Sequence, residues 1–267
     1  MISFPLFKQT LKSNYKFFII FLMILTMYFS VIITMYDPIN VESMQLLLQS
    51  LPKEVVNAMN FNLIMTTFTG FLASYLYGFL IIVFPMIYII ILANRLVAKH
   101  IDNGSMAYLL ATPNSRKKVV FTQMIYLVSS IIFLMVSLFL LAYIISEIAY
   151  PGLIDVKTFV ILNFGALLLH LAIGSIAFLS SCIFNDSKDS LAFGAGIPIL
   201  FFLIQMLSNV GDKLSFLKNF TMFSLFNPQR ILEESPSVPI SFTALFLIAA
   251  LLYTAGIVIF NKKDLPI

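Results

Sequence analysis

Long uncharged apolar stretches alternate with short polar segments along the whole chain. Each apolar stretch reaches the roughly 20 residues that a helix needs to cross the hydrocarbon core of a bilayer. Membrane β-barrels instead show alternating segments of about 10 residues. The pattern therefore predicts an all-α membrane protein with six transmembrane helices. We place these spans at about 17–36, 70–94, 119–146, 158–185, 190–210 and 240–260.

The composition supports this fold class. Hydrophobic residues make up 60% of the chain and charged residues 10%, whereas an average soluble domain has roughly 25% charged residues. We expect residues 1–267 to form a single transmembrane domain. The net charge of +4 is explained by an uneven distribution of Lys and Arg along a membrane protein, so it does not call for a nucleic-acid partner.

Lys and Arg gather in alternate polar segments, at 8–16, 95–118 and 262–263. Cytoplasmic segments of membrane proteins retain positive charge, so both termini and the segment 95–118 should be cytoplasmic. We expect a multi-pass protein of the cell membrane, in a bacterial plasma membrane.

Two polar regions beside the spans have amphipathic patterns. Residues 1–16 carry an apolar stripe next to a basic stripe, which predicts an interfacial helix on the inner leaflet; the alternative is a basic lead-in that only sets the topology. Residues 211–239 predict short outer helices between spans five and six. The candidates for anchoring at the membrane surface are Lys8, Lys12, Lys16, Lys117 and Lys118.

Three residues inside predicted spans interrupt the apolar pattern. Pro85 and Pro198 each remove a backbone donor and tend to kink a helix, so both are hinge candidates. His170 is near the middle of the fourth span. A neutral His that bonds a neighbouring helix is the favoured explanation, and a relay or substrate ligand is the alternative.

The sequence lacks the motifs of the common catalytic sites. It contains no G-x-x-x-x-G-K-[ST], H-E-x-x-H, G-x-S-x-G or C-x-x-C, so we expect no enzyme activity, no metal site and no nucleotide site in this chain. It also has no Asp, Glu, Lys or Arg at the centre of a predicted span, whereas a proton-coupled carrier would be expected to have one there.

The polar segment 95–118 carries the most specific pattern. The third span is preceded by Gly104-Ser105, then by Leu109-Leu110-Ala111-Thr112-Pro113, and then by Ser115-Arg116. This order resembles the first cytoplasmic loop of type-2 ABC transporter permeases, roughly Gly-Thr-x-x-x-Leu-Leu-x-x-Pro-x-Ser-Arg. Many members also carry a Glu shortly before the Gly, where this sequence offers only Asp102.

The resemblance implies that residues 99–113 form a coupling helix that docks into a separate ATPase subunit. ATP and Mg would be bound by that subunit, in two copies, and a second permease, identical or homologous, would complete the transporter. Substrate-binding residues are unknown. The expected coupling residues are Asp102, Gly104, Met106, Leu109, Leu110, Pro113 and Arg116.

The expected function is therefore that of the membrane-spanning subunit of an ATP-driven transporter, an exporter of an amphiphilic or hydrophobic substrate. Two other classes remain as alternatives: a secondary carrier without an ATPase, and a non-transporting membrane immunity or assembly protein. Detection of an associated ATPase would separate the transporter from both.

Overall fold

The computed structural model describes residues 2–37, 50–58, 67–111, 114–210 and 212–264. Six helical segments in it are long and apolar enough to cross a membrane, and no strand occurs in the described ranges. The prediction of an all-α membrane protein with six spans is confirmed. The segments are α1 (Phe4–Thr34), the run from α4 to α6 (Phe68–Asp102), α8 (Arg116–Ala149), α9 (Val156–Ile183), α10 (Ser187–Val210) and α12 (Val238–Lys262).

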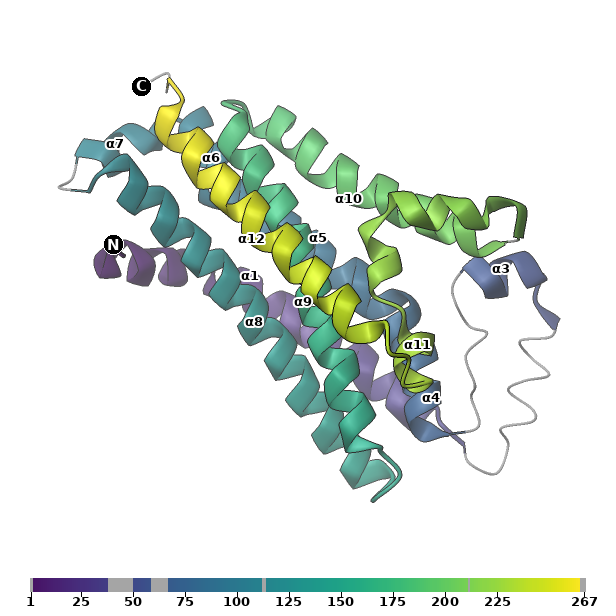
Figure 1. Ribbon diagram of the computed structural model, residues 1–267. Coiled ribbons are helices and arrows are strands. Elements are labelled where there is room, and N and C mark those ends of the chain that lie inside the picture. The colour runs from purple at the N-terminus through teal and green to yellow at the C-terminus, as the bar shows by residue number, and fades with distance from the viewer. Residues whose placement is uncertain (1, 38–49, 59–66, 112–113, 211, 265–267) are drawn as a thin grey trace.

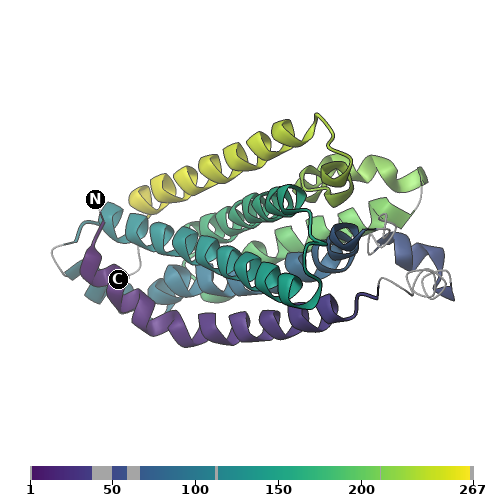
Figure 2. The same ribbon diagram turned by 90° about the horizontal axis from the view of Figure 1, so that it is seen from below.

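The first element differs from the prediction, because the interfacial segment and the first span form one helix. α1 continues without a break across residue 16 and is followed by Pro38. No Gly or Pro occurs between Leu6 and Met35, so nothing in this stretch ends a helix. The first turns nevertheless run in another direction from the rest of α1 (Figures 1 and 2).

The second span is an α-helix with an irregular middle. α4 (Phe68–Tyr75) passes into the π-helix η1 (Leu76–Leu80) and then into α5 (Ile81–Leu96), which contains Pro85. Proline cannot donate a hydrogen bond to the carbonyl four residues before it. A π-turn followed by an internal proline gives a helix with weakened backbone bonding in the middle of this segment.

His170 of α9 reaches this irregular stretch. Its Nδ1 lies 2.7 Å from the Ala166 carbonyl, and its Nε2 lies 3.4 Å from the carbonyl oxygen of Ile82. The side chain is fully buried. His170 therefore contacts a neighbouring helix close to Pro85, and its role remains a prediction. The hinge roles of Pro85 and of Pro198, which lies inside α10, remain predictions.

α9 lies at the centre of the bundle. It packs against α5, α8, α10 and α12. In an apolar stretch of 18 residues, 72% of α9 is buried, whereas only 17% of the corresponding stretch of α10 is buried. Small residues on α9 let its neighbours approach closely. At Gly174 a Cβ atom would lie 2.7 Å from both Ile131 of α8 and the Tyr253 hydroxyl of α12.

The short outer helices between spans five and six are present. They comprise the 3₁₀ helices η2 (Asp212–Phe220) and η3 (Met222–Leu225) and the α-helix α11 (Pro228–Leu232). A further short helix, α3 (Lys53–Ala58), follows α1 and packs against α10. These elements lie at the end of the bundle away from the two chain ends (Figure 1).

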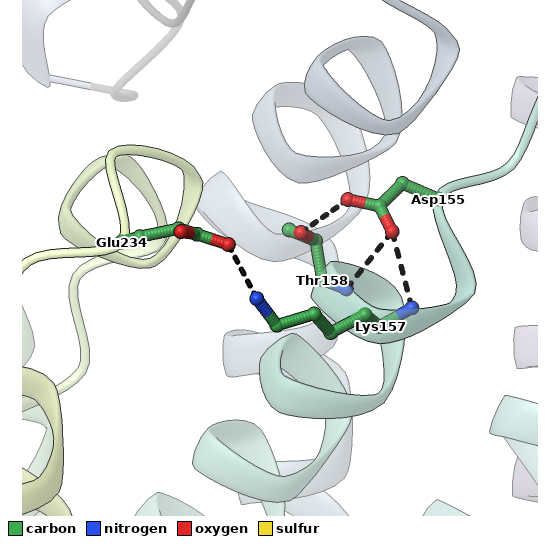
Figure 3. Close-up of polar contacts among 4 residues, drawn as sticks. All are labelled: Asp155, Lys157, Thr158 and Glu234. Atoms are coloured by element: carbon green, nitrogen blue, oxygen red, sulfur yellow. Dashed lines mark hydrogen bonds and ion pairs between the residues drawn. The ribbon is translucent and has the colours of Figure 1, made fainter.

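Asp155 forms the N-cap of α9 at this end of the bundle (Figure 3). Its carboxylate accepts hydrogen bonds from the Thr158 hydroxyl and from the backbone N–H groups of Lys157 and Thr158. These bonds hold the pKa of Asp155 below its ordinary value, and the bond from the Thr158 hydroxyl has the largest effect. The adjacent Lys157–Glu234 pair, at 2.6 Å, is about 70% exposed and therefore contributes little.

Asp155→Ala should lower the free energy of unfolding by about 1 kcal/mol at neutral pH, because the first N–H groups of α9 lose their acceptor. Since folding lowers the pKa of this carboxyl, its stabilisation is present above the ordinary pKa and is lost as the pH falls below about 4. Unfolding in detergent, followed by circular dichroism at both pH values, measures the difference. If Asp155→Ala lowered the free energy of unfolding by the same amount at neutral pH and near pH 3, this role of the charge would be contradicted. Asp155→Asn, which keeps an uncharged acceptor, is the control.

Candidate functional site

Two short helices lie between α5 and α8 at one end of the bundle. α6 (Ala98–Asp102) follows α5 after a single residue, and α7 (Ser105–Ala111) follows α6 after two. Both chain ends lie at this same end (Figure 1). The predicted coupling loop 95–118 is therefore mostly helical, and we call this end the polar end of the bundle.

The turn between α6 and α7 is built by its own sequence. Gly104 has a φ of 71°, a left-handed conformation that favours glycine. The Asn103 Oδ1 accepts hydrogen bonds from the Ser105 N–H at 3.1 Å and from its hydroxyl at 2.7 Å. The Ser105 hydroxyl also lies 2.7 Å from the Nδ1 of His100. Asp102 is exposed at the end of α6, so its carboxylate is available to a partner.

The predicted apolar face of α7 is turned toward the protein itself. Met106 is only 1% exposed and belongs to the hydrophobic core. Leu109 and Leu110 are half-buried and pack against the same core. These three side chains hold α7 on the bundle, while Pro113 lies outside the described residues.

Tyr108 is the outward-facing large side chain of α7, with 80% of its surface exposed. Tyr108 is not among the coupling residues that the sequence predicts. Its position two residues after Met106 places it roughly 200° away around the helix, on the opposite face from the buried methionine. Helical periodicity alone could therefore have placed Tyr108 on the face opposite Met106, but it does not tell which of the two faces is exposed.

The start of α8 is connected to the C-terminal segment. Ser115 caps α8 through a hydrogen bond from the Lys118 N–H, and the Arg116 guanidinium donates to the Lys263 carbonyl at 3.1 Å. The Lys263 amine donates to the carbonyls of Cys182 and Phe184, at 3.3 and 2.7 Å. Burial lowers the pKa of Lys263 to about 8. Arg116 thus serves a contact within the chain, between α8 and the end of α12.

The predicted surface lysines lie on the first turns of α1 and at the start of α8. Lys8, Lys12, Lys16 and Lys117 are exposed, and Lys118 is half-buried. Lys8, Lys12 and Lys16 belong to α1 and Lys117 and Lys118 to α8, so none of them is part of the unit formed by α6 and α7. Within the described ranges, no group of three or more His, Cys, Asp and Glu side chains is placed to hold a metal ion.

Comparisons with known proteins bear on this arrangement. The family model described as "ABC-2 family transporter protein" matches residues 7–265. No curated protein and no solved structure matches the chain. The family match runs from the first turns of α1 through the six apolar segments to the end of α12, and includes the α6–α7 unit. The chain therefore belongs to the ABC-2 family of transporter proteins.

Proposed function

We propose that this protein is the permease subunit of an ATP-driven exporter of amphiphilic or hydrophobic substrates, energised by a separate ATPase. Two ATPase copies and a second permease copy would complete the transporter. The polar end would face the cytoplasm of a bacterial cell, with Lys8, Lys12, Lys16, Lys117 and Lys118 at the inner leaflet. The observation that carries the proposal is the α6–α7 unit with its exposed Tyr108.

The geometry supports a mechanical role for this unit. α6 is nearly continuous with α5, and Met106 inserts α7 into the core of the bundle. A partner that moved α7 would therefore also displace the end of α5, because packed interiors do not absorb such shifts. Pro85 and the π-turn lie further along the same span and could bend in response.

Purification of the tagged full-length chain from its native membrane in mild detergent tests the proposal. We expect a P-loop ATPase to co-purify and the complex to hydrolyse ATP in the presence of Mg. Replacing the P-loop Lys of that partner should abolish hydrolysis but keep the complex, since this residue contacts the phosphates of ATP. If no ATPase accompanies the native chain, the carrier or immunity alternatives take its place.

A further inference from the structure

A cavity of about 400 Å³ lies at the polar end, between the first turns of α1 and the unit formed by α5, α6, α7 and α8. We call it the polar pocket. Its lining differs from the apolar interior of the bundle, because most of its side chains are charged or carry amides and hydroxyls. They include Arg95, Lys99, Gln9, Ser13, Asn14 and Gln123.

The polar pocket has an excess of positive charge. Arg95 and Lys99 line it, whereas no Asp or Glu does so among the described residues. Neither cation takes part in an ion pair within the described part of the chain. Asp102, on the same short helix as Lys99, is exposed and does not line the pocket. The pocket can therefore neutralise an anion.

The Arg95 side chain is held in place from one side. Its guanidinium carbon lies 4.2 Å from the centre of the Phe17 ring, a cation–π contact that leaves the N–H groups at the edge of the guanidinium. That planar fork of donors matches the oxygens of a carboxylate or a phosphate. Since Phe17 belongs to α1, the contact also fixes Arg95 relative to the pocket wall.

Gln123 supplies an independent sign of a missing ligand. Its side chain is 1% exposed, and its Nε2 has no hydrogen-bond partner, while its Oε1 lies 3.4 Å from the Thr10 hydroxyl. A buried amide donor without an acceptor is unfavourable. Gln123 lines the polar pocket, and an oxygen-bearing ligand toward which its amide turned would provide the acceptor.

We propose that the polar pocket binds a phosphate group, such as the headgroup phosphate of an anionic lipid. The pocket lies where the second and third spans end, which is the depth of lipid headgroups for helices of this length. Two cations and an amide donor suit the several acceptor oxygens of a phosphate. Bound there, the phosphate would join α5 and α6 to α8 beside the α7 unit.

A fluorescence titration of the full-length chain tests this proposal. The chain contains no Trp, so Phe17→Trp introduces a single Trp, which can be excited selectively, and keeps an aromatic ring beside Arg95. This reporter chain is reconstituted in phosphatidylcholine vesicles with increasing fractions of phosphatidylglycerol. We expect a saturable change in Trp emission. In the double variant Arg95→Gln, Lys99→Gln, the fraction of phosphatidylglycerol that gives half saturation should rise about tenfold or more, since charge-assisted hydrogen bonds are lost.

Two further variants keep the test decisive. Lys188→Gln, at an exposed lysine outside the pocket, removes one positive charge, as Lys99→Gln does, and should leave the half-saturating fraction unchanged. Gln123→Leu should raise it by roughly fivefold, since one neutral hydrogen bond is lost, without lowering thermal stability. Lys99→Gln alone alters only an exposed side chain, so weaker binding by this variant cannot be assigned to misfolding.

The outcomes separate the sources of the phosphate. If inorganic phosphate does not reduce the response to phosphatidylglycerol, the pocket is assigned to a lipid. Displacement by inorganic phosphate assigns it to a soluble anion of the same chemistry. If the Phe17→Trp chain and its Arg95→Gln, Lys99→Gln variant respond alike to phosphatidylglycerol and to inorganic phosphate, the proposal is overturned. The assay requires no ATPase, so its result is independent of the proposed transport function.

Discussion

Tyr108→Ala should separate the permease from its ATPase while leaving the bundle folded. Tyr108 is 80% exposed at the polar end, and exposed tyrosines that become buried at an interface are among the residues whose truncation costs most. We expect a loss of about 2 kcal/mol of binding free energy, or roughly 30-fold in affinity. The ATPase should then be depleted from the co-purified complex, and ATP hydrolysis by the preparation should fall with it.

Ile148→Ala is the matched control for this experiment. Ile148 is 78% exposed, but it lies near the C-terminal end of α8, far along the helix from the polar end. Its truncation should leave the ATPase bound. Full retention of the ATPase by Tyr108→Ala would remove α7 as the docking element, whatever the function of the chain.

Met106→Ala should act differently from Tyr108→Ala. Because Met106 is buried in the core, its truncation leaves a cavity that costs about 2–5 kcal/mol of folding free energy. The yield and thermal stability of the chain alone should therefore fall before any binding is measured. Comparing both variants for stability in detergent shows whether a lost ATPase reflects the interface or the fold.

Gly174→Val should be among the most destabilising substitutions in the bundle, at about 3 kcal/mol. A Cβ at this position would already lie 2.7 Å from Ile131 and from the Tyr253 hydroxyl, and valine adds two further methyl groups. α9 is packed between α8 and α12 and cannot move away from both. Thermal unfolding of the purified chain in detergent, followed by circular dichroism, measures the loss.

Gly196→Val provides the internal comparison. No atom lies within 4 Å of a Cβ at Gly196 of α10, so the same substitution should change stability by less than about 0.5 kcal/mol. Tyr253→Phe should restore part of the stability of Gly174→Val, because it removes a clashing hydroxyl that has no hydrogen-bond partner. Equal stabilities of the two Gly→Val variants would contradict the central position of α9.

The candidate site shows how far sequence reasoning reached. The Asn103-Gly104-Ser105 turn and the position of α7 follow from local chemistry, since glycine favours the left-handed turn and polar residues end the second span. The orientation of α7 does not follow from local chemistry. An apolar stripe containing Met106 and Leu110 marks one face of a helix, but it does not tell whether the chain's own core or a partner covers that face.

The sequence by itself determined the number of spans and the end of the bundle that is polar, because chain length and polarity decide what can lie in a bilayer. Only the tertiary structure decided which glycine is crowded, which tyrosine is exposed and which cations share a pocket. Gly174 and Gly196 both lie within apolar helices. They differ in what packs against them, and that packing depends on residues distant along the chain, such as Ile131 and Tyr253.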